Sequence, residues 1–164
     1  MEIRLEKVKA EEKEILHRLL QYSLYEESGT DQNEMGDDGL FEYQWFDCYF
    51  EQQDKMQRDA YFIREQETGK LLGFVMVNEY LQKFSEGHSI AEFMVLPKYR
   101  RCGIGKKAAV WCFEAYRGNW EVQPSYGSEK AYQFWKSVIE EYTDGECRFE
   151  DGIFLFQTNF FVRR

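Results

Sequence analysis

The spacing of apolar side chains changes period along the chain, and each change marks a predicted helix or strand. Apolar residues recur at every third or fourth position in three segments, which predicts amphipathic helices over residues 11–25, 104–116 and 128–142. Short segments rich in β-branched and aromatic residues predict strands instead. These strands cover residues 2–8, 60–64, 71–78, 89–96, 120–123, 147–150 and 153–161, and the aromatic segment 41–50 predicts one more helix.

Turn residues between these segments indicate which strands are neighbours. The turn at residues 67–70 contains Gly69 and predicts a hairpin, and Asp151-Gly152 predicts another between the last two strands. Hairpins join antiparallel strands, and amphipathic helices must cover the faces of the sheet. The pattern therefore predicts an α/β fold with a mixed, mainly antiparallel sheet and helices on both faces. At 164 residues, the chain is expected to form a single domain over residues 1–164.

Composition narrows the class of protein further. The formal net charge is −9, which argues against nucleic acid as the main partner. No apolar stretch reaches the length of a membrane span, and the charged N-terminus lacks the apolar core of a signal peptide. We therefore expect a cytoplasmic protein without a membrane partner. The four cysteines and two histidines lack metal-ligand spacing, so we expect reduced thiols and no metal.

Negative charge is concentrated between residues 26 and 42. Glycines interrupt the same stretch, which favours a loop or short helices over a core element. Aromatic residues overlap it and continue beyond it, and these either join the core or form the wall of a site. The acidic residues are Glu26, Glu27, Asp31, Glu34, Asp37, Asp38 and Glu42, and the aromatic ones are Phe41, Tyr43, Trp45, Phe46 and Tyr49.

The most informative segment covers residues 90–108. A buried strand, a proline-led turn, two arginines, Gly103-x-Gly105 and a basic helix follow one another there. This order places backbone N–H groups at a helix N-terminus, which is an anion-binding arrangement. Glycine has no Cβ, so the backbone at both glycines can come close to a ligand. Four basic side chains in an acidic protein indicate a small polyanionic ligand: Arg100, Arg101, Lys106 and Lys107.

Two well-known phosphate-binding motifs fit this segment poorly. A Walker A motif requires Ser or Thr after Gly-Lys, but Lys107 follows Gly105-Lys106, and Arg100 stands where the first glycine is required. Gly103-x-Gly105-x-x-Ala108 matches the letters of a dinucleotide fingerprint. That fingerprint, however, needs its first glycine directly after the strand, and its fold needs more downstream strands than this chain can hold.

The segment resembles the GNAT superfamily of N-acetyltransferases. The family motif Arg/Gln-x-x-Gly-x-Gly/Ala matches Arg100-Arg101-Cys102-Gly103-Ile104-Gly105, and the preceding EFMVLPKYR is similar to the family's strand and turn. Downstream, Ala131-x-x-Phe134-Trp135 resembles a later family helix. The resemblance covers about residues 60–160 well and the earlier residues only by general layout. It implies a GNAT-like domain that transfers an acetyl group from acetyl-CoA directly to a primary amine.

The resemblance also implies which residues bind acetyl-CoA. Backbone groups near Met94 and Val95 would pair with the pantetheine arm as an additional strand does. Ser128, which replaces the Asn of the family helix, and Trp135 would lie beside the cofactor, and Lys130 is either a phosphate ligand or a solvated lysine. The pyrophosphate would be bound by the loop residues Arg100, Arg101, Cys102, Gly103, Ile104, Gly105 and Lys106.

Glu92 is the leading candidate for the general base. It lies in the middle of a strand among apolar residues, and a carboxyl in such surroundings has a raised pKa that makes it a usable base. Family members with Glu at a similar place use it to deprotonate the amine. The alternative is a glutamate that simply pairs with a neighbouring Lys or Arg. Strand alternation predicts Glu92 and Met94 on one face of the sheet and Phe93 and Val95 on the other.

A general acid is harder to assign. Many GNAT members have Tyr where this chain has Trp135, and an indole can donate a hydrogen bond but has no proton to lose at neutral pH. Tyr132, and with it Tyr126, is the nearest alternative acid, although ordinary packing explains both. His88 is either a base near neutral pH or a surface histidine.

The nature of the acceptor and of the assembly stays open at this level. The acidic stretch falls where the family builds part of its acceptor site, so the acceptor is expected to be cationic: a polyamine, an aminoglycoside, or a lysine or N-terminal amine. A solvated acidic loop is the alternative. Transfer of another acyl group, or a CoA-binding sensor without turnover, would fit the same loop. We expect a monomer or homodimer, with residues 154–161 either in the core or at a dimer contact.

Overall fold

A computed structural model describes residues 1–158, which form a seven-stranded sheet and three α-helices. The strands are β1 (Ile3–Lys7), β2 (Arg58–Glu65), β3 (Leu71–Asn78), β4 (His88–Val95), β5 (Gly118–Val122), β6 (Arg148–Glu150) and β7 (Ile153–Thr158). The helices are α1 (Lys13–Asp31), α2 (Ile104–Ala115) and α3 (Glu129–Thr143). Residues 159–161, predicted as the end of the last strand, lie outside the described residues.

The sheet has the strand order β1-β2-β3-β4-β5-β7-β6. All neighbouring strands are antiparallel except β4 and β5, which run parallel. Both predicted hairpins are present. Gly69 (φ 73°) lies in the first, and Asp151 (φ 52°) and Gly152 (φ 80°) form the second in the left-handed conformation that such tight turns require. The predicted mixed, mainly antiparallel sheet is confirmed.

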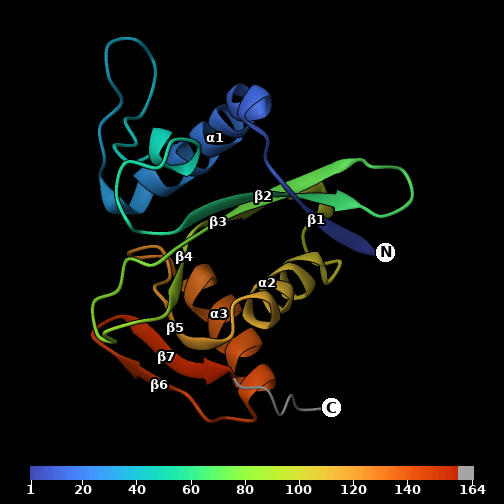
Figure 1. Ribbon diagram of the computed structural model, residues 1–164, viewed down its shortest axis with the longest axis vertical. Coiled ribbons are helices and arrows are strands. Elements are labelled where there is room, and N and C mark those ends of the chain that lie inside the picture. The colour runs from blue at the N-terminus through green and yellow to red at the C-terminus, as the bar shows by residue number, and fades with distance from the viewer. Residues whose placement is uncertain (159–164) are drawn as a thin grey trace.

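The helices cover both faces of the sheet, as predicted (Figure 1). α1 lies on one face, and α2 and α3 lie on the other. Neighbouring residues of β3 show the division, because their side chains alternate. Phe74 packs with Leu16 of α1, whereas Val75 packs with Phe113 of α2 and Ile139 of α3. The single sheet therefore separates two apolar layers, and β3 contributes to both.

α1 is longer than predicted. It continues to Asp31, through residues that the sequence placed in an acidic loop, and ends where Gln32 adopts a left-handed conformation (φ 66°). Hydroxyl groups, which often compete with helical hydrogen bonds, are satisfied inside this last turn. Ser28 Oγ donates to the carbonyl of Tyr25, and Thr30 Oγ1 donates to that of Glu27. The first part of the predicted loop is therefore helical.

The predicted helix over residues 41–50 is wrong. Only a single 3-10 turn forms there, at Asp47–Tyr49. Phe41 and Phe46 are buried under α1 together with Leu16. Their spacing therefore reflects burial in the core and not a helical period.

Side-chain chemistry elsewhere in the fold is simple. All four cysteines are free thiols, and burial raises the pKa of Cys112 to about 12. Within residues 1–158, no group of three metal-ligating side chains is present. No helix in the same range is both long enough and apolar enough to cross a membrane.

Candidate active site

β4 and β5 separate after only two residue pairs, and this separation creates the candidate site. The strands pair at His88–Trp120 and Ser89–Glu121. From Ile90 onward, the β5-facing edge of β4 has no strand partner within the described part of the chain. A cavity of about 780 Å³ lies beside this edge. An unpaired strand edge can hydrogen-bond an extended ligand as an additional strand would.

Glu92 lines this cavity from the middle of β4, at a β-bulge. Val77 of β3 pairs with Ile90, whereas Met76 pairs with Glu92, so Ala91 is an extra residue on β4. A bulge of this kind re-aims neighbouring side chains and is common beside functional sites. Glu92 lies two residues before Met94, so its carboxyl is on the α1 side of the sheet, where it contacts Glu27.

The predicted alternation of side chains continues beyond the bulge. Met94 belongs to the apolar layer under α1. Phe93 and Val95 pack on the other side of the sheet, against α2 and α3. The α1 side of β4 therefore carries one carboxyl group, that of Glu92, among apolar neighbours.

The carboxyl of Glu92 is hydrogen-bonded to a second carboxyl, that of Glu27 on α1. No Lys or Arg forms an ion pair with Glu92 in residues 1–158. Burial, followed by the charge of Glu27, raises the pKa of Glu92 well above the usual value for glutamate, and burial also raises the pKa of Glu27. Two carboxyls in direct contact cannot both ionise easily, so the pair favours the state in which the two share one proton and carry one negative charge.

Sequence reasoning missed Glu27 as the partner of Glu92, because it placed Glu27 in a loop. The signal was present in the helical spacing. Leu16, Leu20 and Ser23 form one buried stripe of α1, and Glu27 continues it at the i+4 position. Ser23 Oγ donates a hydrogen bond to Glu27 Oε1 over 3.2 Å, which fixes the carboxyl on this side of the helix.

Two tyrosines lie beside the carboxyl pair. The side chain of Tyr43 lies beside the carboxyl of Glu92, and Asn78 Nδ2 donates to the hydroxyl of Tyr49 over 3.3 Å. Burial raises the pKa of Tyr43, and it raises that of Tyr49 to about 12, so both phenols stay protonated near neutral pH. Tyr43, Trp45 and Tyr49 all line the cavity. The aromatic segment thus supplies walls of this site as well as core residues.

The acidic stretch contributes less to the cavity than its charge suggests. Glu27 is the only acidic residue of the described stretch 26–42 that lines the cavity. Asp31 and Asp38 accept hydrogen bonds from backbone N–H groups two residues further on, and Glu26 pairs with Arg100. These three carboxylates therefore have hydrogen-bond or ion-pair partners outside the cavity.

The loop between β4 and α2 presents unpaired N–H groups. A 3-10 turn at Pro97–Tyr99 follows β4, and Arg101 (φ 66°) and Gly103 (φ 78°) then adopt left-handed conformations. α2 begins at Ile104, and no side chain in the described part of the chain caps its first N–H groups. These donors and the positive end of the helix dipole suit an anion.

The basic side chains of this loop differ in whether other protein groups already bind them. Arg100 Nε donates to the carbonyl of Val95 over 2.8 Å, and its guanidinium forms the ion pair with α1. Lys106 forms an ion pair with Glu141 of α3. Arg101 is exposed and has no partner among residues 1–158. Arg100 therefore connects the loop to β4 and α1, and Arg101 is the arginine that is available to a ligand.

The two glycines of the loop serve different purposes. A Cβ on Gly103 would meet nothing within 4 Å, so the positive φ is what requires glycine there. A Cβ on Gly105 would lie 3.0 Å from ring atoms of Phe134, so Gly105 allows α2 and α3 to approach each other. Between them Ile104 is buried, whereas the side chain of Cys102 is exposed with its Sγ 3.6 Å from the carbonyl of Arg100.

Ser128 and Trp135 take distinct positions on α3. Ser128 is the N-cap of the helix, as its sequence predicts, and its Oγ accepts a hydrogen bond from the N–H of Ala131 over 3.1 Å. Trp135 is buried, lines the cavity and packs edge-on against Phe93, with 4.9 Å between ring centroids. Trp135 is thus a wall of the cavity at the open edge of β4.

The two candidate tyrosine acids lie in different places. Tyr126 lines the cavity and is largely exposed. Tyr132 does not line the cavity, because its ring stacks on Phe154 and contacts Phe149 edge-on. Lys130 is exposed. Of the two hydroxyls, that of Tyr126 is the one with access to a ligand in the cavity.

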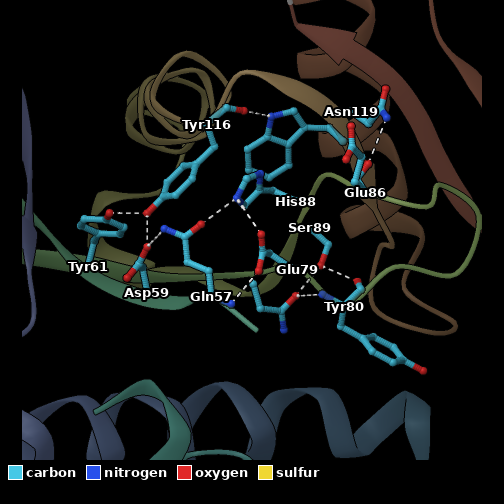
Figure 2. Close-up of polar contacts among 12 residues, drawn as sticks. Gln57, Asp59, Tyr61, Glu79, Tyr80, Glu86, His88, Ser89, Tyr116 and Asn119 are labelled. Carbon is cyan, nitrogen blue, oxygen red and sulfur yellow. Dashed lines mark hydrogen bonds and ion pairs between the residues drawn. The ribbon is translucent and has the colours of Figure 1, made fainter. Parts of the chain in front are cut away.

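His88 begins β4 and belongs to a polar network outside the cavity (Figure 2). Its Nε2 lies 3.0 Å from Gln57 Oε1, Gln57 Nε2 donates to Asp59 over 3.0 Å, and the hydroxyl of Tyr116 donates to Asp59 over 2.7 Å. An amide oxygen only accepts, so Nε2 of His88 carries the hydrogen. Nδ1 is buried and has no partner within residues 1–158. Burial lowers the pKa of His88, which favours a neutral imidazole.

Comparison with known proteins gives a family and a fold. The profile described as "Acetyltransferase (GNAT) family" matches residues 22–137. A crystal structure from Corynebacterium glutamicum described as "histone acetyltransferase HPA2 and related acetyltransferase" has 11% identity and a TM-score of 0.65, with 97% of this chain and 98% of that chain covered. An acetyltransferase of the GNAT family from Streptococcus agalactiae has 12% identity and a TM-score of 0.58, with 99% and 96% covered.

A third structure is longer than this chain. It is a tandem GNAT protein from the clavulanic acid biosynthesis pathway, with 13% identity and a TM-score of 0.57. The match covers 92% of this chain but only 45% of the tandem protein. No curated protein sequence gives a significant match. At these identities, the structural likeness concerns the fold alone.

Proposed function

Because the chain belongs to the GNAT family of acetyltransferases, we propose that it transfers the acetyl group of acetyl-CoA directly to a primary amine of a small cationic molecule. One observation carries this proposal. A carboxyl with a raised pKa, that of Glu92, lines a cavity at the unpaired edge of β4, and an anion-binding loop begins at the end of the same strand.

The residues around the cavity suit acetyl-CoA, which supplies the acetyl thioester. The uncapped N–H groups at the start of α2 and the free side chain of Arg101 would bind the pyrophosphate. The open edge of β4 near Met94 and Val95 would hydrogen-bond the pantetheine arm. Trp135 would pack beside the thioester end, because it lines the cavity next to this edge. Arg100 supports the site by holding the loop against β4 and α1.

Glu92 would act on the acceptor amine. The amine nitrogen must give up a proton as it bonds to the acetyl carbon. Glu92 lines the cavity from the open strand β4, and its ionised carboxyl would accept this proton. The carboxyl of Glu27 and the side chain of Tyr43 lie against Glu92 and would keep it in place. Alignment of amine and thioester within the cavity supplies much of the remaining acceleration.

The test combines two measurements on the purified protein. Release of free thiol from acetyl-CoA is followed with a panel of primary amines, and CoA binding is measured by calorimetry. We expect CoA binding together with thiol release for at least one cationic amine. CoA binding without release across the panel would favour a sensor without turnover, a function consistent with Trp135 in place of tyrosine. Absence of CoA binding would refute the assignment of the loop at residues 100–105.

A matched pair of substitutions tests the source of the proton for the leaving thiolate. We expect Tyr126→Phe to lower kcat about tenfold, because a thiol with a pKa near 8.5 leaves readily and needs little help from an acid. Tyr132→Phe should leave kcat unchanged, since Tyr132 packs against Phe149 and Phe154 outside the cavity. Steady-state thiol release above and below the pKa of CoA measures both effects. Equal loss in the two variants would argue against Tyr126 as the acid.

A further inference from the structure

Four carboxyl groups and one guanidinium line the proposed acceptor cavity, and their interactions decide how much negative charge an acceptor meets. They belong to Glu27, Asp54, Glu92, Glu121 and Arg58. An acidic cavity attracts a cation only through carboxylates that other protein groups do not already neutralise or saturate. The partners of each carboxyl group thus determine whether its charge is available to an acceptor.

Glu121 is saturated by the backbone. Its carboxylate accepts hydrogen bonds from the N–H groups of Gln82, Lys83 and Phe84, at 2.9, 2.8 and 2.8 Å. Glu121 is buried, and these three bonds hold the loop between β3 and β4 in place. A carboxylate with this many N–H donors has a structural role, and little of its charge remains for a ligand.

Asp54 is neutralised by Arg58. The guanidinium donates two hydrogen bonds to the carboxylate, at 2.8 and 3.2 Å, so the pair is bidentate. The same guanidinium lies over the ring of Trp45, 5.6 Å from its centroid. One face of Trp45 is therefore already occupied by a cationic side chain of the protein.

The remaining charge belongs to the hydrogen-bonded pair of Glu27 and Glu92. Since the two carboxyls share one proton, the pair carries one negative charge. It lies where α1 faces β4, beside the hydroxyls of Tyr43 and Ser23. Outside this pair, aromatic side chains line the cavity together with uncharged polar ones such as Asn78 and Ser89. The aromatic residues include Tyr43, Trp45, Tyr49, Tyr80 and Tyr126.

We infer, on the basis of the proposed function, that the acceptor is a monoamine with a single ammonium group on an apolar or aromatic body. One uncompensated carboxylate pair matches one ammonium, and aromatic side chains match an apolar body. A second ammonium in the same cavity would lose water without gaining a carboxylate, which is unfavourable. Polyamines and aminoglycosides, which carry several ammonium groups, are therefore poor fits to this cavity.

Two amines that differ by one ammonium group test this inference. Hexylamine and 1,6-diaminohexane are titrated by calorimetry into the protein saturated with CoA. We expect hexylamine to bind at least about tenfold more tightly than the diamine. Equal or tighter binding of the diamine would overturn the inference. This experiment measures binding without turnover. Failure to release thiol from acetyl-CoA would contradict the proposed function, but the two binding constants would still test the preference for one ammonium group.

A substitution tests whether the ion pair of Arg58 with Asp54 is what disfavours the second ammonium group. Arg58→Gln should free Asp54 and narrow the difference between the two amines by about fivefold. Lys136→Gln is the matched control, because Lys136 forms an i,i+4 ion pair with Glu140 on α3, outside the cavity. The control should leave the ratio unchanged. An unchanged ratio of the two amine affinities in a folded Arg58→Gln protein would contradict the role of this pair. If that variant does not fold, the wild-type measurement decides the inference.

Discussion

Glu92→Gln is expected to lower kcat for acetyl transfer by about a hundredfold to a thousandfold, the range for loss of a general base. The amide has nearly the same shape as the carboxyl, so it can keep the contacts with Glu27 and Tyr43. It cannot accept a proton from the amine. CoA affinity should stay within about twofold of the wild type, because Glu92 lies away from the loop at the start of α2. Steady-state thiol release and calorimetric CoA binding measure the two quantities.

The pH dependence provides the control for this variant. The raised pKa of Glu92 means that wild-type kcat/KM should increase with pH through a value above the usual pKa of glutamate, since the base must be ionised. Glu27→Gln removes the neighbouring negative charge, so the increase should move to lower pH. A Glu92→Gln protein that retains the wild-type rate, or an unmoved profile in Glu27→Gln, would contradict the assignment.

Stability should respond to pH through the same pair. A carboxyl whose pKa is raised on folding stabilises the protein fully below its unfolded pKa, and this contribution is lost as pH rises through the folded pKa. The wild type should therefore lose stability as the pair ionises, and Glu92→Gln should lose less over the same range. Chemical denaturation at several pH values compares the two proteins.

Gly73→Ala is expected to destabilise the protein by about 3 kcal/mol, at the upper end of the effect of overpacking. A Cβ on Gly73 of β3 would lie 2.1 Å from the carbonyl oxygen of Met94 and 3.0 Å from the Cα of Val95. These are backbone atoms of β4, so a side-chain rotation cannot relieve the clash and the two strands must move apart. The melting temperature should fall by about 6–12 °C.

A second glycine provides the matched control for this substitution. Gly29 lies inside α1, and a Cβ there would meet nothing within 4 Å. Gly29→Ala should therefore stabilise the protein by about 0.5–1 kcal/mol, since alanine favours the helix over glycine. Displacement of β4 in Gly73→Ala should also weaken CoA binding, whereas Gly29→Ala should not. Equal melting temperatures for the two variants would show that β3 and β4 are less closely packed than described.

Much of the fold follows from local sequence patterns. The helices over Ile104–Ala115 and Glu129–Thr143, and the turn at Asp151-Gly152, are encoded by short-range periodicity and turn chemistry. α1 was predicted too short because Ser28 and Gly29 have poor helix propensity, which its tertiary contacts override. Residues 41–50 were predicted as a helix because buried aromatic residues also occur at helical spacing in irregular segments.

The candidate site depends more strongly on contacts between distant segments. The sequence identified Glu92 and the loop that begins at Arg100, because each lies within one continuous motif. It did not identify the contact between Glu27 and Glu92, which depends on the extension of α1 and on the packing of that helix over β4. It also did not separate Tyr126 from Tyr132. Tyr126 lies in the turn before α3 and lines the cavity, whereas Tyr132 on α3 packs against Phe149 and Phe154 of the two last strands. Interactions between distant segments require the tertiary structure.

The narrow junction between β4 and β5 also bears on how the chain folds. β2, β3 and β4 are consecutive hairpin strands, and β5, β7 and β6 all come from residues 118–158. Strand pairing inside each set closes mostly short loops, which costs little chain entropy and favours rapid formation. The two sets share only two residue pairs, so the packing of α2 and α3 across both is the main connection between them. The sheet is thus expected to unfold as two cooperative units, with the proposed binding cleft at their boundary.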